Sequence, residues 1–294
     1  MLITSANCWA GAKTKHNAYF DKLVNDRICK NFSNLTVGLC NFLVANHSLI
    51  RDGNEQDFRK IQSGYEKILS SIPKEDHEKI DSAIKNIFDY SHFSTKRLRR
   101  WCAYRLCSHL NIKTCPYCNL SNEITVFEDD EGGEIRPALD HFFDKATYPL
   151  FAISLGNLIP SCHHCNSTCK GAADFFVNSH LHPQNDLECI KILLDTPVIS
   201  ARMDLRSLDK ARINLVFNGS NKKAINSIKT FKISKRYNGV VDEIRRIAKN
   251  MVEYSTSGSN DPKQLGWVLR NVDSNNYRDR MYGRAILDLS SVYL

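Results

Sequence analysis

Two groups of apolar side chains in the first 110 positions recur at the spacing of one face of an α-helix. They are Tyr19, Phe20, Leu23, Val24 and Ile28, and then Ile80, Ile84, Ile87 and Phe88. The second group follows Pro73, Glu75 and Asp76, residue types that suit the first turn of a helix. We therefore expect residues 1–110 to form a mostly helical N-terminal region.

A third apolar stripe in this region is interleaved with basic residues. The apolar members are Leu98, Trp101, Cys102 and Leu106, and the basic ones are Lys96, Arg97, Arg99, Arg100 and Arg105. The pattern predicts one helix with an apolar side and a strongly basic side. The basic side either contacts nucleic acid, through Arg97, Arg99 and Arg100, or is a solvated helix surface; the sequence leaves both open.

The pattern changes at residue 111. Ile124, Val126 and Phe127 resemble a short strand, residues 129–133 (Asp-Asp-Glu-Gly-Gly) supply a turn, and residues 135–142 suggest a returning strand. A short helix is expected from near Ser161 to about Gly171, since glycine is a frequent helix terminator. Residues 111–185 thus predict a hairpin, a loop and a helix.

The last third, residues 186–294, predicts a mixed but mainly helical region. Residues 213–217 alternate like a strand, residues 240–251 have helical spacing, and residues 275–294 suggest another helix. The serine-rich stretch 255–260 is expected to be a loop between the two helices. The expected fold class is therefore α+β, with a small central module between two mostly helical regions.

Charge and hydropathy narrow the class of protein. The chain has 294 residues and a formal net charge of +8. It has no apolar run of the roughly 20 residues that a membrane-spanning helix needs. Because the N-terminus lacks a basic start followed by an apolar stretch, no secretory signal is expected. These features predict a cytoplasmic protein that does not engage a membrane.

The charge is unevenly distributed along the chain. Residues 111–180 carry 4 basic and 9 acidic side chains, whereas residues 1–110 carry 17 and 11, and residues 181–294 carry 19 and 12. An acidic middle between basic flanks suits a cation-binding centre held between surfaces that attract a polyanion. The same pattern is also compatible with a charge that serves only solubility.

Four of the eleven cysteines form two Cys-x-x-Cys pairs, Cys115/Cys118 and Cys162/Cys165. Together the pairs can supply four thiolates to a closed, tetrahedral and structural zinc site. The competing interpretation is redox chemistry by one of the pairs. Three further residues near the second pair are possible substitute ligands: Cys169, His163 and His164.

The order of motifs is more specific than any one of them. It runs CPYCN (115–119), ALDHFFDKATYP (138–149) and NLIPSCHHCNSTCKG (157–171). Residues 113–185, a quarter of the chain, closely resemble the HNH endonucleases, whose ββα-metal motif is embraced by a four-cysteine zinc site. The resemblance is nearest to prokaryotic antiphage-defence nucleases such as the Septu and retron-associated subunits. It implies an ABC/SMC-like ATPase as a partner.

The resemblance implies a role for each motif residue. His141 would be the general base, while Asp140 and Asn166 would bind a catalytic Mg²⁺ or Mn²⁺. Asn157 would hold the His141 loop by hydrogen bonds, and Lys170 would meet a phosphate oxygen. These residue types also make chemical sense, because neutral imidazole accepts a proton from water and hard oxygen donors suit Mg²⁺.

One residue departs from the family pattern. Asp144 stands where many members have proline. Its carboxylate could pair with Lys145, help to bind metal or simply be exposed at the surface, and we expect surface exposure.

The predicted function is metal-dependent phosphodiester hydrolysis that leaves 5′-phosphate and 3′-hydroxyl ends, as the resemblance implies. DNA is the favoured substrate, and RNA stays open because the motif reads the backbone rather than the bases. The alternative is a non-catalytic zinc module that binds nucleic acid or a partner protein.

Overall fold

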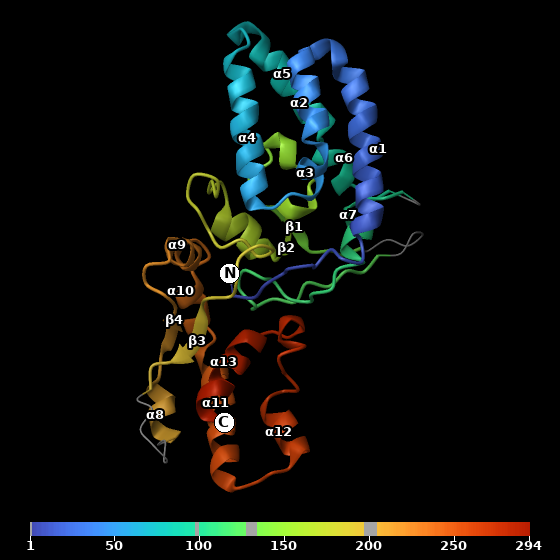
Figure 1. The fold of residues 1–294 in the computed structure, drawn as a ribbon. Coiled ribbons are helices and arrows are strands. Elements are labelled where there is room, and N and C mark those ends of the chain that lie inside the picture. Colours follow the sequence, from blue (N-terminus) through green and yellow to red (C-terminus); the bar gives the residue numbers. More distant parts are fainter. Residues whose placement is uncertain (1, 98–99, 128–133, 197–204) are drawn as a thin grey trace.

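The computed structural model is helix-rich and has two small antiparallel sheets, which is compatible with the expected α+β class. It describes residues 2–97, 100–127, 134–196 and 205–294. Figure 1 shows the N-terminal helices at one end, the sheet of β1 and β2 in the middle, and the C-terminal elements at the other end. In these ranges no helix combines the length and apolar character required to cross a bilayer.

Helices dominate the N-terminal part, and the two that apolar spacing predicted are confirmed as α1 and α5. Local signals fix other helix starts, since Thr36 and Asn54 accept hydrogen bonds from backbone N–H groups in the first turns of α2 and α4. The elements are α1 (Lys13–Asn31), η1 (Phe32–Asn34), α2 (Val37–Ala45), α3 (His47–Asp52), α4 (Glu55–Ser70), α5 (Lys74–Ile87), α6 (Tyr90–Ser94) and α7 (Ala103–Cys107).

The basic helix expected over residues 96–106 is wrong. Among the described residues of this range only α7 is helical, because Cys102 has extended backbone angles immediately before it. Arg97 lies outside any helix and its Nε donates to the carbonyl oxygen of His92 at 3.1 Å. Arg100 is exposed in a bend, and Arg99 falls outside the described residues.

The central sheet pairs β1 (Ala138–His141) with β2 (Leu158–Ser161). This corrects the expected hairpin, in which the strand around Leu139 would have paired with residues 124–127. Those residues form only an isolated bridge, between Val126 and Ile135. All four residues of β2 are buried, so β2 lacks the alternation of polar and apolar residues that marks a half-exposed strand.

Short helical turns connect and follow the two strands. They are η2 (Pro149–Phe151), η3 (Leu155–Asn157) and η4 (His164–Lys170). The turn η4 is π-helical and ends at Gly171, which has a positive φ of 50°. The expected helix is therefore present but begins after Ser161, which belongs to β2.

The C-terminal part contains the second sheet and the remaining helices. The expected strand at 213–217 and the expected helix at 240–251 are confirmed as β4 and α11. The loop expected at 255–260 begins later, because α11 continues to Ser257. The elements are β3 (Lys191–Leu194), α8 (Leu205–Lys210), β4 (Ile213–Val216), α9 (Lys222–Thr230), α10 (Ile233–Asn238), α11 (Val241–Ser257), α12 (Pro262–Val268), η5 (Tyr277–Asp279) and α13 (Gly283–Tyr293).

One hydrophobic core runs through all three parts of the chain. The Phe58 ring of α4 lies 4.4 Å from that of Phe151 in η2, measured between centroids. Near the N-terminus, Trp9 Nε1 donates to the carbonyl oxygen of Leu158 in β2 at 3.0 Å. The helical N-terminal part is therefore packed directly against the central strands that carry the candidate site.

Candidate functional site

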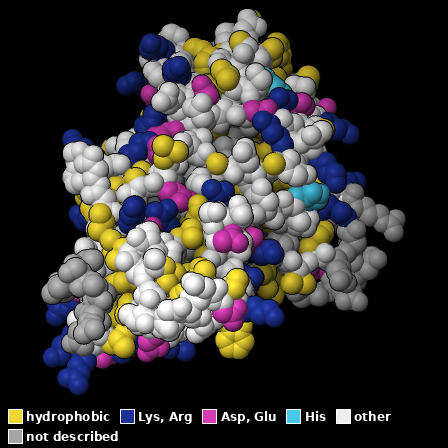
Figure 2. All heavy atoms as spheres, turned by 60° about the horizontal axis from the view of Figure 1, so that its bottom comes forward, with side chains coloured by type: hydrophobic (Ala, Val, Ile, Leu, Met, Phe, Trp, Pro, Cys, Tyr) yellow, Lys and Arg dark blue, Asp and Glu magenta, His cyan; other side chains and the backbone are white. Residues whose placement is uncertain are grey.

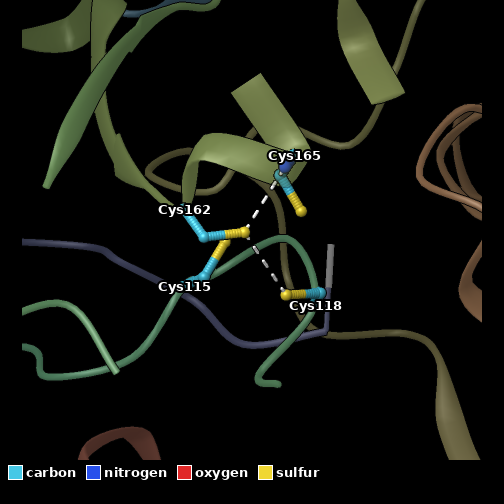
Figure 3. A group of neighbouring side chains, drawn as sticks. All are labelled: Cys115, Cys118, Cys162 and Cys165. Atoms are coloured by element: carbon cyan, nitrogen blue, oxygen red, sulfur yellow. Dashed lines mark hydrogen bonds between the residues drawn. The ribbon is translucent and has the colours of Figure 1, made fainter. Parts of the chain in front are cut away.

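Cys115, Cys118, Cys162 and Cys165 converge on one buried point, as Figure 3 shows. Their four sulfur atoms all lie within 4.8 Å of one another. Cys118 and Cys162 bring their Sγ atoms to 4.0 Å although 44 residues separate them in the sequence. The two Cys-x-x-Cys pairs thus form one cluster rather than two independent pairs.

Local structure aims each pair at this point. The first pair lies in a tight turn, where the N–H groups of Cys118 and Asn119 both donate to the carbonyl oxygen of Cys115. Asn119 closes the turn with a positive φ of 52°. In the second pair, which joins β2 to η4, the Cys165 N–H donates to Cys162 Sγ at 3.3 Å.

The chemistry of these donors fits zinc. A tetrahedral zinc with Zn–S distances near 2.3 Å needs sulfur atoms roughly 3.8 Å apart, a small contraction of the observed cluster. Burial raises the pKa of the Cys115 thiol well above its ordinary value, so a cation is needed to hold the buried sulfurs as thiolates. Four buried cysteines at this spacing can bind a structural zinc ion.

The suggested substitute ligands are not part of the cluster. The group of cysteine, histidine and acidic residues that meets at this point contains only the four paired cysteines among the described residues. His163 and His164 are exposed, and Cys169 is half-buried.

Arg236 and Tyr237 of α10 support the cysteine cluster, and sequence reasoning missed both. Arg236 donates through a terminal guanidinium nitrogen to Cys165 Sγ at 3.1 Å, where its charge offsets part of the excess negative charge of four thiolates on one Zn²⁺. The Tyr237 hydroxyl donates to the carbonyl oxygen of Cys118 at 2.9 Å. No sequence signal links residues so distant in the chain.

A cleft of about 480 Å³ lies beside this cluster. Its lining includes Asp140 and His141 from β1 and Asn166 from η4. Lys170 of η4 lines it too, so the structure brings four of the predicted site residues to one concave surface. Such a pocket with converging polar groups is the expected form of a binding or active site.

His141 is held in one orientation with one nitrogen left as a proton acceptor. Its side chain is buried, and Nε2 lies 3.0 Å from the carbonyl oxygen of Ala152. A carbonyl oxygen only accepts, so Nε2 carries the proton and Nδ1 is the basic nitrogen. The Tyr90 ring packs edge-on against the His141 ring, with the two ring centroids 4.4 Å apart. Burial, reinforced by the charge of Lys145, lowers the pKa of His141 from 6.5 to about 3, so the ring is neutral at pH 7.

Asn157 lies behind the cleft and does not line it. Its fully buried side chain accepts from the Phe143 N–H at 2.7 Å and donates to the carbonyl oxygens of Phe143 and Phe151. These three bonds fix the chain that leaves β1 directly after His141. Asn157 therefore contacts the loop after His141, which is the loop that it was predicted to hold.

Lys170 lines the cleft at the end of η4, and its ammonium contacts protein acceptors there. Its side chain is 4% exposed, and its Nζ lies 2.7 Å from Asp140 Oδ1. The same ammonium donates to the carbonyl oxygens of His141 and Phe142. Through these three contacts Lys170 holds Asp140 and the end of β1, and its predicted contact with a phosphate stays a prediction.

Asp140 and Asn166 differ in how free they are to bind a cation. The second oxygen of Asp140, Oδ2, accepts from the Tyr117 hydroxyl at 2.6 Å. A carboxylate can accept about four hydrogen bonds, so Asp140 retains acceptor capacity beyond Lys170 and Tyr117. The half-exposed side chain of Asn166 has no hydrogen-bond partner among the described residues. These oxygen donors fit a hard cation such as Mg²⁺.

Two further cleft residues, Arg136 and Lys145, were not identified from the sequence as contributors to the site, and a third, Asp144, was weighed there as a possible metal ligand. Arg136, just before β1, lines the cleft, and its buried Nε has no hydrogen-bond partner. Lys145 lies across the Tyr90 ring, with Nζ 5.6 Å from the centroid. Asp144, expected at the surface, is half-buried and caps a turn by accepting from the N–H groups of residues 146 and 147.

Neither of the described arginines from the basic stripe reaches this cleft. Arg97 and Arg100 are absent from its lining. Their interpretation as nucleic-acid contacts therefore gains no geometric link to the site.

No known family model matches the chain, and no curated protein or solved structure matches it either.

Proposed function

We propose that the chain is a metal-dependent nuclease of the HNH type that hydrolyses phosphodiester bonds, with DNA as the favoured substrate. The observation that carries the proposal is the shared cleft of Asp140, His141 and Asn166 beside a zinc-compatible cysteine cluster. A neutral, oriented histidine and oxygen donors for a hard cation are the groups that such hydrolysis requires.

In the proposed reaction His141 removes a proton from the attacking water. The Ala152 carbonyl fixes the Nε2–H tautomer, so Nδ1 takes the proton. Asn157 keeps the ring in place by holding the backbone after β1 at Phe143. Asn157 is thus a positioning residue whose contribution is orientation rather than chemistry.

Asp140 and Asn166 would hold the divalent cation. When bound, such a cation neutralises charge on the phosphate and stabilises the leaving oxygen. Lys170 and Tyr117 orient the Asp140 carboxylate for this task. Among the cleft cations, Arg136 is suited to a phosphate oxygen, because it lines the cleft and carries a planar guanidinium.

The test is cleavage of supercoiled plasmid and of single-stranded RNA by the full chain with Mg²⁺. His141→Ala should reduce cleavage by about 10²–10⁴-fold, the usual cost of losing a general base, and Mn²⁺ should not restore it. Asn166→Ala should also lose activity, but excess Mn²⁺ should recover part of it. His77→Ala, a change on α5 outside the cleft lining, is the matched control.

A binding measurement covers the case in which the nuclease is silent without a partner. Water-proton relaxation should detect Mn²⁺ bound to the parent and weaker binding to Asn166→Ala. A parent that neither cuts nucleic acid nor binds Mn²⁺ would contradict the proposal. That result would favour the non-catalytic zinc module, for which the buried Asp140–Lys170 ion pair is a purely structural contact.

The resemblance extends the proposal to a role in antiphage defence beside an ABC/SMC-like ATPase. The supporting observation is the motif order of residues 115–171, which resembles those systems. Co-purification of the tagged chain with such an ATPase from its native cell is the test, and isolation of the chain without one would contradict this extension.

A further inference from the structure

A long stretch of the C-terminal part carries basic residues and no acidic ones. Between Asp209 and Asp242 the chain has eight Lys and Arg side chains and no Asp or Glu. The segment from the start of α9 to the end of α10 carries six of the eight, five in the helices and Lys232 just before α10: Lys222, Lys223, Lys229, Lys232, Lys235 and Arg236. The stretch is therefore a local concentration of positive charge within a chain of modest net charge.

Two of these six cations have structural partners and four do not. Lys223 forms ion pairs with Glu55 and Asp186, and Arg236 donates to Cys165. The other four are exposed and have no ion-pair partner among the described residues: Lys222, Lys229, Lys232 and Lys235. We call these four residues the α9–α10 lysines.

The helices that carry these lysines are fixed to the core. Phe231, between α9 and α10, is fully buried and stacks on the Tyr117 ring at 4.2 Å. The hydroxyl of the same tyrosine donates to Asp140. In α9, Ser227 accepts from the Leu181 N–H at 2.9 Å. The α9–α10 lysines are therefore presented from rigid elements at set positions.

Their placement suits an extended polyanion near the cleft. Lys222 and Lys229 are seven residues apart on one face of α9, which separates them by roughly 10 Å along the helix axis. The α10 residue Arg236 contacts Cys165, whose neighbour Asn166 lines the cleft. In Figure 2 Lys and Arg side chains are spread over the drawn face, and some of them lie on the left, the side on which Figure 1 places α9 and α10.

The chemistry favours nucleic acid over a lipid surface. Helices that bind membranes combine cations with exposed large apolar side chains. In α9 and α10 the one exposed large hydrophobic residue is Ile225. Unpaired lysines without an apolar face instead match a phosphate backbone.

We infer that the exposed face of α9 and α10 binds the phosphate backbone of nucleic acid through the α9–α10 lysines. This inference rests on the proposed function, since the nucleic acid bound there is the substrate of the adjacent cleft. It assigns substrate affinity to the C-terminal part and the chemistry to the central part.

The experiment measures binding of a fluorescent 30-base-pair DNA duplex by anisotropy across a salt series. All proteins carry His141→Ala, so that cleavage does not interfere. The test variant changes the four α9–α10 lysines to Gln. The control variant changes four exposed lysines of α1 and α5 to Gln and so removes the same charge: Lys22, Lys30, Lys74 and Lys79.

The test variant should bind the duplex about tenfold or more weakly at low salt. It should also flatten the slope of log affinity against log salt by up to about 3.6, since each lost phosphate contact removes about 0.9. The control variant should change affinity by less than about threefold. Equal losses in both variants, or no loss in the test variant, would overturn the inference.

Two further arms separate the possible failures. Parent binding to phosphatidylserine vesicles that the test variant loses, with duplex binding intact, would assign the lysines to a membrane and overturn the inference. Plasmid cleavage is then measured with His141 restored. A parent that neither cuts nor binds Mn²⁺, with duplex binding still dependent on the α9–α10 lysines, would contradict the proposed function and leave this surface standing.

Discussion

At the scale of single residues, the main finding is that the Asp140 carboxylate in the site forms an ion pair with Lys170. Lys170 and Asp140 face each other in a nearly fully buried ion pair. A basic residue one helical turn beyond a motif asparagine is easily interpreted as a phosphate ligand from sequence. The structure adds a second role, because the Lys170 ammonium, at the wall of the cleft, contacts Asp140 and two backbone carbonyl oxygens.

Lys170→Met should destabilise the protein by about 3–5 kcal/mol, since it leaves the Asp140 carboxylate buried without its partner. The double variant Asp140→Asn/Lys170→Met removes both charges and should regain more than half of that loss. Urea unfolding followed by circular dichroism measures both values. A single variant within 1 kcal/mol of the parent would show that Asp140 does not depend on Lys170.

At the scale of elements, close backbone contact joins the N-terminal helices to the central strands. A Cβ atom at Gly156 in η3 would lie 2.3 Å from the carbonyl oxygen of Gly53 and 3.2 Å from the Phe58 ring. The turn between α3 and α4 therefore packs against η3 in a way that only glycine allows. Asn157, the next residue, is held in the same contact region.

Gly156→Ala should cost about 1–3 kcal/mol of unfolding free energy, because the backbone of the two turns must separate. The matched control is Gly38→Ala in α2, where an added Cβ meets nothing within 4 Å. That change should stabilise by up to about 1 kcal/mol through helix propensity. Thermal unfolding of both variants tests the pair, and equal melting temperatures would refute the packing argument.

The cysteine cluster joins the turn at residues 115–119 to the junction of β2 and η4. The metal content of the protein therefore tests whether these two elements share one site. Purified protein should hold about one zinc per chain, and Cys115→Ser/Cys118→Ser should lose it together with protection from proteolysis. Cys29→Ser is the control, because Cys29 is exposed and outside the cluster. Elemental analysis gives the count, and stoichiometric zinc in the double variant would disprove a shared site.

At the scale of the whole molecule, buried neutral histidines make stability depend on pH. His16 is fully buried: its Nε2 donates to the carbonyl oxygen of Ile153 at 2.8 Å, and its Nδ1 accepts from Trp101. Burial lowers the pKa of His16 from 6.5 to about 4. His182, also fully buried, has its pKa lowered to about 4 for the same reason.

Unfolding free energy should therefore fall as pH drops from 6.5 toward 4. In this window the unfolded chain binds protons that the folded chain excludes, at about 1.4 kcal/mol per pH unit for each histidine. Above pH 6.5 both states are neutral and the full stability is present. Urea unfolding of the parent and of His16→Gln, each at pH 7 and pH 5, isolates the contribution of His16 to this pH dependence. If the unfolding free energies of the two proteins changed equally between pH 7 and pH 5, the assigned contribution of His16 would be contradicted.

The sequence predicted those features that depend on the spacing of residues close together in the chain. Apolar spacing located α1, α5 and α11, and the Cys-x-x-Cys pairs located the cluster. It failed where the partner is distant in the chain. The mate of β1 is the wholly buried β2, which shows no alternation, and Arg236 approaches Cys165 from another part of the sequence.

Tyr117 lies between the cysteines of the first pair, and its hydroxyl holds Asp140 at 2.6 Å. One residue thus connects the turn that carries two of the cysteines to a carboxylate that lines the cleft. Occupancy of the two places is consequently linked, and thermodynamic reciprocity applies. If an ion at the cysteines raises the affinity of the cleft for a ligand that engages Asp140, that ligand must raise the affinity of the cysteines for the ion by the same factor. Zinc supply in the cell would then set how firmly the cleft holds its ligands.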